Sequence, residues 1–209
     1  MENLQELINS KEINERITGI LSLEKLIDLH YEDPRKITRF SNYLRNSLTN
    51  YHSDSTTVAL VARALGKLAK ASSTTSSKTL TAELVEFECK RALEWLEGFK
   101  EKHKDEGRRF AGLLVLKELA ENAPTLFYAH VSSFLIHIWK GIKDQNIETR
   151  EASILALRAV LALVSERNFN GRHEWYHEML NNVKQLMKKN NESIHGSLLV
   201  RERKKKKKN

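Results

Sequence analysis

Apolar residues recur along this chain of 209 residues at intervals of three and four, the spacing that places them on one face of an α-helix. Runs that alternate apolar and polar residues between hairpin turns do not occur, so the pattern indicates an all-α fold. Asp33 with Pro34, and Asp54 or Ser55, are predicted to start helices, because these residues suit the cap and the first helical position. The spacing predicts helices over residues 12–30, 36–48, 56–71, 81–97, 108–121, 125–142, 147–164, 174–189 and 193–200.

One helical phrase recurs, with small residues followed by leucines at helical spacing. The copies are residues 16–26 (RITGILSLEKL), 61–68 (VARALGKL), 109–119 (RFAGLLVLKEL) and 150–160 (REASILALRAV), with a shorter fifth copy at 194–200 (IHGSLLV). Matching their apolar anchors gives steps of 42, 51, 41 and 44 residues; the anchors are Leu23/Leu26, Leu65/Leu68, Leu116/Leu119 and Leu157/Val160, and Ile154 with Leu198. A period of about 40–47 residues with two helices per unit is typical of HEAT and armadillo repeats. We therefore expect a right-handed α-solenoid of about four to five helical pairs over residues 1–200, a fold that presents binding surfaces.

The longest step contains the polar segment 72–79 (SSTTSSKT). A surface insertion between repeats costs little, so we interpret this segment as an inter-repeat loop. Phosphorylation of its hydroxyl groups is the alternative that its composition leaves open.

The formal net charge of +8 comes mainly from residues 201–209 (RERKKKKKN), which hold seven basic residues and one acidic residue. Residues 1–200 carry 28 basic and 26 acidic residues, so nucleic-acid binding by the solenoid ranks below protein binding. We expect residues 201–209 to form a basic disordered tail, for which nuclear localisation and contact with an anionic surface are the functional alternatives. The lone Cys89, the polar N-terminus and the lack of a long apolar run predict a soluble intracellular protein.

One short motif raises the possibility of a zinc hydrolase. His173, Glu174 and His177 match H-E-x-x-H, which on a helix can present two zinc ligands and a general base on one face. A third protein ligand is needed, and Glu192 and His195 are the only later candidates. The motif also falls where a repeat must begin, so packing is the favoured explanation and we expect no metal, cofactor or catalytic residue.

The other chemically distinctive residues are also expected to have structural roles. Cys89 lies in a helix and is predicted to be a small buried hydrophobe, while Trp95, Trp139 and Trp175 are expected to pack between repeats more than to anchor a partner. Asp144 is placed to cap the following helix and to pair with an arginine of its own or a neighbouring repeat, with a weak surface ion pair as the alternative. Motifs of nucleotide binding and of kinase catalysis do not occur.

Longer blocks carry a family resemblance. Residues 39–48 (RFSNYLRNSL), 85–96 (VEFECKRALEWL) and 106–120 (EGRRFAGLLVLKELA) closely resemble the N-terminal HEAT region of the target of rapamycin (TOR) serine/threonine protein kinases, which belong to the PI3K-related kinases. Shorter blocks continue the resemblance in order over about residues 10–200: 14–16, 19–21, 124–127, 175–176 and 194–199.

The resemblance implies a scaffold in nutrient-responsive growth signalling, with the kinase domain elsewhere in the full-length protein. It implies assembly with a regulatory-associated (raptor-like) subunit in TOR complex 1, with other subunits in TOR complex 2, and with a second TOR chain. It also implies a cytoplasmic location with endomembrane association through the complex. No catalytic residue is carried over to this chain, and the sequence assigns no partner-contact residues.

The two ends of the chain depart from the family pattern. The sequence starts inside the first helical pair and stops inside the fifth, where it turns into the lysine run after Val200. We interpret it as a fragment, with a gene-model truncation or frameshift after Val200 as the hypothesis. The alternative is a free-standing HEAT-repeat adaptor that uses its basic tail as a targeting signal.

Overall fold

The fold is helical throughout the part of the chain that the structure describes. The computed structural model describes residues 2–30, 33–49, 54–73, 78–98, 105–167 and 172–186, and none of these residues is in a strand. The helices are α1 (Glu2–Ile8), α2 (Ile13–His30), α3 (Pro34–Thr49), α4 (Ser55–Ser73), α5 (Lys78–Glu97), α6 (Asp105–Asn122), α7 (Pro124–Phe127), the 3-10 turn η1 (Tyr128–His130), α8 (Val131–Ile142), α9 (Ile147–Glu166) and α10 (Arg172–Leu186). The prediction of an all-α fold is confirmed.

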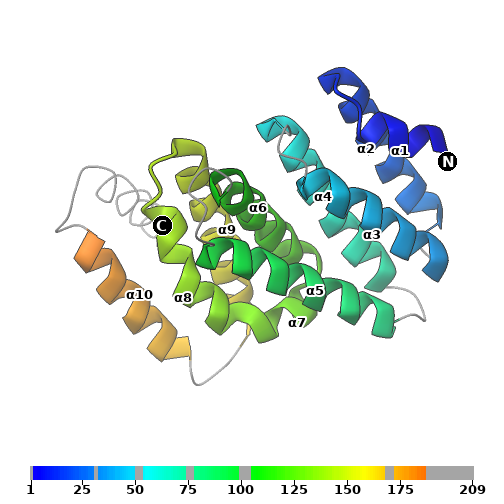
Figure 1. Cartoon of the computed structure of the whole chain (residues 1–209). Helices are drawn as coiled ribbons and strands as arrows, with labels where there is room; N and C mark the ends of the chain where they lie inside the picture. The colour runs from blue at the N-terminus through cyan, green and yellow to red at the C-terminus, as the bar shows by residue number, and fades with distance from the viewer. Residues whose placement is uncertain are drawn as a thin grey trace, which may run out of the picture.

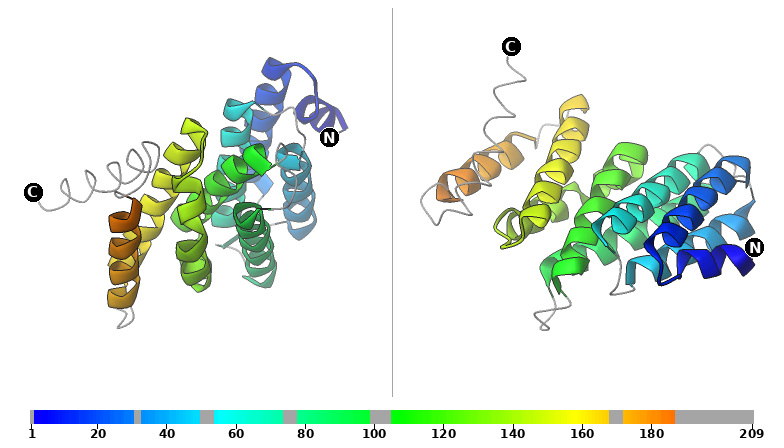
Figure 2. Two further views of the ribbon diagram at one scale, coloured as in Figure 1. Left: turned by 60° about the vertical axis from the view of Figure 1, so that its left-hand side comes forward. Right: turned by 90° about the horizontal axis from the view of Figure 1, so that it is seen from above.

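Consecutive helices pair and the pairs stack in a row, with α1 and α2 at one end and α10 at the other (Figures 1 and 2). Within the pairs, α1 packs on α2, α3 on α4, α5 on α6 and α8 on α9. Between the pairs, α2 packs on α4, α4 on α6, and α6 on α9. These four helices form one continuous layer, which we call the second-helix layer. The other layer, the first-helix layer, contains α3, α5, α8 and α10. The stack is an α-solenoid, as the repeats predicted, and its right-handedness stays a prediction.

The repeated apolar anchors of the second-helix layer belong to the buried core. Leu23, Leu65, Leu116 and Leu157 occur at matching positions of α2, α4, α6 and α9, and all four are buried. Burial of a leucine side chain contributes about 1.5–3 kcal/mol relative to its exposed form. The four anchors therefore explain why the phrase recurs: each copy buries a leucine at the matching position of its helix.

Two glycines of the repeated phrases lie where neighbouring helices approach closely. A Cβ atom at Gly112 of α6 would lie 2.9 Å from the carbonyl oxygen of Ala92 in α5. A Cβ atom at Gly66 of α4 would lie 2.9 Å from Cβ of Glu118 in α6. Both the contact within a pair and the contact between pairs thus depend on a residue without a side chain, as the small residues of the phrase indicated.

The predicted helix starts at Asp33 and Asp54 are confirmed. Oδ1 of Asp33 accepts a hydrogen bond from the amide of Arg35 at 3.0 Å, and Pro34 is the first residue of α3. Oδ1 of Asp54 accepts a hydrogen bond from the amide of Thr57 at 2.9 Å. Each carboxylate satisfies an amide that the first turn of a helix leaves without an intrahelical partner.

The structure differs from the predicted elements in two places. A short helix, α1, precedes the first predicted helix and packs on α2. The helix predicted over residues 125–142 is divided into α7, η1 and α8. The buried residues Phe127, Val131 and Phe134 keep helical spacing through this interruption. The apolar pattern therefore did not indicate that the helix is divided here.

The end of the predicted fifth pair is outside the part of the chain that the structure describes. This applies to the fifth copy at residues 194–200, to the helix predicted over residues 193–200 and to the basic tail over residues 201–209. The division of the chain into a solenoid and a tail accordingly stays a prediction.

Candidate functional site

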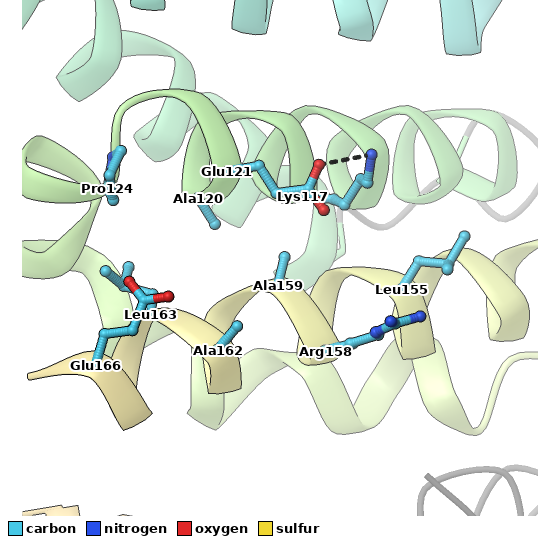
Figure 3. Close-up of a pocket in the computed structure, with 10 residues that line it drawn as sticks. All are labelled: Lys117, Ala120, Glu121, Pro124, Leu155, Arg158, Ala159, Ala162, Leu163 and Glu166. Atoms are coloured by element: carbon cyan, nitrogen blue, oxygen red, sulfur yellow. Dashed lines mark ion pairs between the residues drawn. The ribbon is translucent and has the colours of Figure 1, made fainter. Parts of the chain in front are cut away.

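A groove in the second-helix layer is a concave surface formed by two neighbouring repeats. It lies between α6 and α9 and has a volume of about 470 Å³ (Figure 3). Small side chains from both helices, Ala120, Ala159 and Ala162, line it together with Leu163. Its remaining lining residues are Lys117, Glu121, Pro124, Leu155, Arg158 and Glu166.

The charged side chains on the α6 side of the groove are paired with each other. Nζ of Lys117 lies 2.8 Å from Oε1 of Glu118 and 2.9 Å from Oε2 of Glu121. Burial by itself would lower the pKa of Lys117, but the hydrogen bonds to both glutamates outweigh it and raise the pKa above 10.5. The ammonium group is therefore held in its charged form, and its charge is neutralised within α6.

The charged side chains on the α9 side are not paired. Arg158 and Glu166 are exposed, and neither has an ion-pair partner among the described residues. They are eight residues apart, which on a helix corresponds to about 12 Å. The groove therefore has a free cation toward one end and a free anion toward the other, with alanines between them.

This arrangement suits binding. The lining contains no Ser, Thr, Cys or His side chain, so it offers no Ser–His or Cys–His pair for nucleophilic catalysis. Alanines on the floor allow close approach by another backbone, while the rim supplies charges that select a partner. Such a combination of an apolar floor and a polar rim is the usual anatomy of a protein-binding surface.

The first-helix layer is held by a buried charge cluster that the sequence did not indicate. Glu88 of α5 is completely buried, and its carboxylate accepts hydrogen bonds from Arg45 of α3 and from Arg91. The guanidinium of Arg45 also lies 4.1 Å from the ring centre of Phe87. Burial lowers the pKa of Arg91, with Glu88 acting in the opposite direction. Because Arg45 and Glu88 are 43 residues apart, no local pattern could reveal their contact.

The H-E-x-x-H motif lies on α10 at the end of the described stack. His173, Glu174 and His177 are all exposed, and Nδ1 of His177 lies 3.2 Å from Nδ2 of Asn181. Across the described ranges, no group of three or more His, Cys, Asp and Glu side chains could hold a metal ion. The two later candidate ligands, Glu192 and His195, lie outside those ranges.

Cys89 and the three tryptophans are packing residues in this structure. Cys89 is fully buried, and burial raises the pKa of its thiol well above the ordinary value. Trp95 and Trp139 are buried, and Trp175 of α10 meets Tyr128 edge to face, with 6.3 Å between ring centroids. The expected burial of Cys89 is confirmed, and the contact with Tyr128 confirms packing between repeats for Trp175. For Trp95 and Trp139 the structure shows burial, and their packing between repeats stays a prediction.

Asp144 has one of its two expected roles. Its Oδ2 atom accepts a hydrogen bond from Nε of Arg109 at 2.8 Å, so it pairs with an arginine of the neighbouring repeat. The cap of α9 is instead Asn146, whose Oδ1 atom accepts from the amides of Glu148 and Thr149. The ion pair is largely buried, because the Asp144 side chain is only 5% exposed. The alternative of a weak surface pair is therefore wrong.

Comparison with known proteins places this chain against one segment of much larger kinases. It is 38% identical to the serine/threonine-protein kinase tor1 of Schizosaccharomyces pombe over 199 residues. It is 34% identical to the serine/threonine-protein kinase TOR of Arabidopsis thaliana over 202 residues. It is 33% identical to the serine/threonine-protein kinase TOR2 of Saccharomyces cerevisiae over 203 residues. These matches cover 93–95% of the chain but 8% of each relative. No protein-family model matches the chain. The described helices include none that is long and apolar enough to cross a membrane.

Proposed function

We propose that this chain is part of the N-terminal HEAT region of a TOR-type serine/threonine protein kinase and that it binds other subunits of the kinase complex. Two findings support the proposal: the similarity to one segment of TOR kinases along almost the whole chain, and the stacked helical pairs. In this proposal residues 1–200 are the solenoid and residues 201–209 a basic tail. Kinase activity is contributed by a different part of the full-length protein.

The groove between α6 and α9 is the observation that carries the binding role. Stacking buries the apolar anchors of both helices, so a partner must bind to the side chains that stay at the surface. In the groove, these side chains are the alanines of the floor and the two unpaired charges. The proposed partners are a raptor-like subunit, other subunits of TOR complexes 1 and 2, and a second TOR chain. The proposed location is cytoplasmic, with endomembrane association through the complex.

Co-purification of the full chain with a raptor-like subunit from the same source tests this role. Ala162→Trp fills the floor of the groove from a half-buried position, and we expect it to lower the amount of co-purified subunit at least tenfold. Ala59→Trp is the matched control, because Ala59 is exposed on α4, in the same layer, and does not line the groove. Equal retention of the subunit by both variants, or no binding by the unmodified chain, would contradict the proposal.

A further inference from the structure

We infer that the groove between α6 and α9 accepts one helix of a protein partner, and that this helix carries a carboxylate and a cation two turns apart with small aliphatic residues between them. The inference rests on the proposed binding function and adds the chemistry of the segment that is bound. In this arrangement the carboxylate meets Arg158 and the cation meets Glu166.

The charge pattern of the partner follows from which charges the groove leaves unpaired. Two cations and two anions line the groove, so its total charge is zero. The pair between Lys117 and Glu121, joined by the dashed line in Figure 3, removes one charge of each sign. The two that remain, Arg158 and Glu166, belong to the same helix. A complementary segment must therefore present opposite charges in the matching order along α9.

The spacing follows from the geometry of α9. Leu155, Arg158, Ala159, Ala162 and Glu166 share one face of the helix, since each lies three or four positions from another member of the set. Arg158 and Glu166 enclose the two alanines. About 12 Å separates the charged positions along the helix axis, so a helical partner that runs alongside needs its own charges eight residues apart.

The secondary structure of the partner follows from the floor of the groove. Ala120, Ala159, Ala162 and Leu163 offer no side-chain hydrogen-bond donor or acceptor. An extended segment would bring backbone amides and carbonyls against this floor without partners, and each unpaired group costs free energy. A helix satisfies these groups internally and contacts the alanines with its side chains. The groove therefore favours a helix over an extended segment.

Two synthetic peptides of equal composition separate these possibilities. Both are alanine-based with two leucines and with blocked ends; one carries Glu and Lys eight positions apart, and the other carries them four positions apart. An extended backbone spans about 12 Å in roughly four residues, so the second peptide matches the groove only if it binds as a strand. Fluorescence polarisation with the full chain is expected to show at least fivefold tighter binding of the first peptide.

Variants of the full chain test the two charges. Arg158→Gln and Glu166→Gln are each expected to weaken binding of the first peptide by about threefold to fivefold, as rim-exposed ion pairs do, and the loss is expected to shrink at high salt. Arg35→Gln and Glu151→Gln are the matched controls, because both side chains are exposed and neither lines the groove. Neither control is expected to change binding.

The results separate this inference from the proposed function. If Ala162→Trp abolishes binding of the raptor-like subunit while Arg158→Gln and Glu166→Gln leave binding of both subunit and peptide unchanged, the groove is a docking site and the charge pattern is refuted. Tighter binding of the peptide with four-residue spacing refutes the helical form. If the peptide binds as expected and no subunit of the complex binds, the proposed function fails and the ligand chemistry stands.

Discussion

Nε of Arg109 in α6 donates a hydrogen bond to Oδ2 of Asp144, 2.8 Å away in the turn before α9. The contact joins two neighbouring helical pairs. A similar contact joins the first two pairs, where Nη2 of Arg16 lies 3.0 Å from Oδ2 of Asp54. Arg16 also donates from Nη1 to the carbonyl oxygens five and six residues before it, as Arg150 does. Arg16 and Arg150 therefore hold the turn of their own repeat, while Arg16 and Arg109 reach the next repeat.

Asp144→Ala is expected to destabilise the chain by about 2–3 kcal/mol, because it leaves the partly buried guanidinium of Arg109 without its carboxylate. Urea denaturation followed by circular dichroism measures the change in the free energy of unfolding. The double variant Asp144→Ala with Arg109→Met is expected to lose less free energy of unfolding than the two single variants lose together, since it removes both charges. Additive costs would show that the two side chains are not coupled.

Replacing glycine by alanine is predicted to destabilise the chain at position 112 but not at position 107. Gly112→Ala forces Cβ against a backbone carbonyl oxygen, and we expect a loss of about 1–3 kcal/mol. Gly107→Ala, in the same helix, adds a methyl group where nothing lies within 4 Å, so better helix propensity is expected to stabilise the chain by up to about 1 kcal/mol. Thermal unfolding of both variants tests the contrast, and a similar effect at both positions would contradict the close approach of α5 and α6.

Stability is expected to fall between about pH 4 and pH 2 partly because of Asp54. Burial by itself would raise its pKa, but hydrogen bonds from the Thr57 hydroxyl and amide and from Arg16 outweigh it and lower the pKa from 3.8 to about 2. A carboxylate with a depressed pKa in the folded state stabilises that state above its unfolded pKa and loses this effect as it is protonated. Because the carboxylate is partly exposed, we expect its protonation to lower the free energy of unfolding by about 1 kcal/mol.

Asp54→Asn tests this pH dependence. The free energy of unfolding of the variant is expected to vary less with pH over this interval than that of the unmodified chain. Glu151→Gln removes an equal charge from an exposed position of α9 and serves as the control. An unchanged pH profile in Asp54→Asn would mean that the hydrogen bonds at Asp54 do not contribute in solution.

Glu88→Gln is expected to destabilise the chain by about 3 kcal/mol, because it leaves Arg45 and Arg91 without the buried carboxylate that they share. Glu83→Gln on the same helix is the control, since Glu83 is exposed and has no ion-pair partner among the described residues, and such surface substitutions usually change stability by at most about 0.5 kcal/mol. Chemical denaturation compares the two variants. An equal loss of stability in both variants would show that the buried carboxylate of Glu88 contributes no more to stability than an exposed one.

Local pattern was sufficient to predict most of the helices and the repeat. The matching leucines could be identified from the sequence because each repeat buries the same position of its second helix; they are Leu23, Leu65, Leu116 and Leu157. The starts of α3 and α4 were predictable from Asp33 and Asp54 because capping involves residues within three positions. The interruption at Tyr128–His130 was not predictable, since apolar spacing continues through it.

The candidate site depended on contacts that no local pattern contains. The groove combines residues of α6 and α9 that are about forty positions apart, and its free charges are defined by which others are already paired. In the sequence, Lys117 and Arg158 are both basic residues within predicted helices. Glu121 lies one turn after Lys117, a spacing that the sequence already contains, whereas no acidic residue lies three or four positions from Arg158. Only the structure shows that no described residue of another helix pairs with Arg158.

The amino-acid sequence by itself determined the all-α class, the repeat and the positions of the stacking anchors, because helical periodicity and capping act over a few residues. The tertiary structure decided the ion pairs between repeats, the burial of Glu88 and the unpaired state of Arg158 and Glu166. The physical reason is that a charge contact requires two side chains within a few ångströms. For residues 35 to 43 positions apart, this distance depends on the offset with which one helical pair stacks on the next.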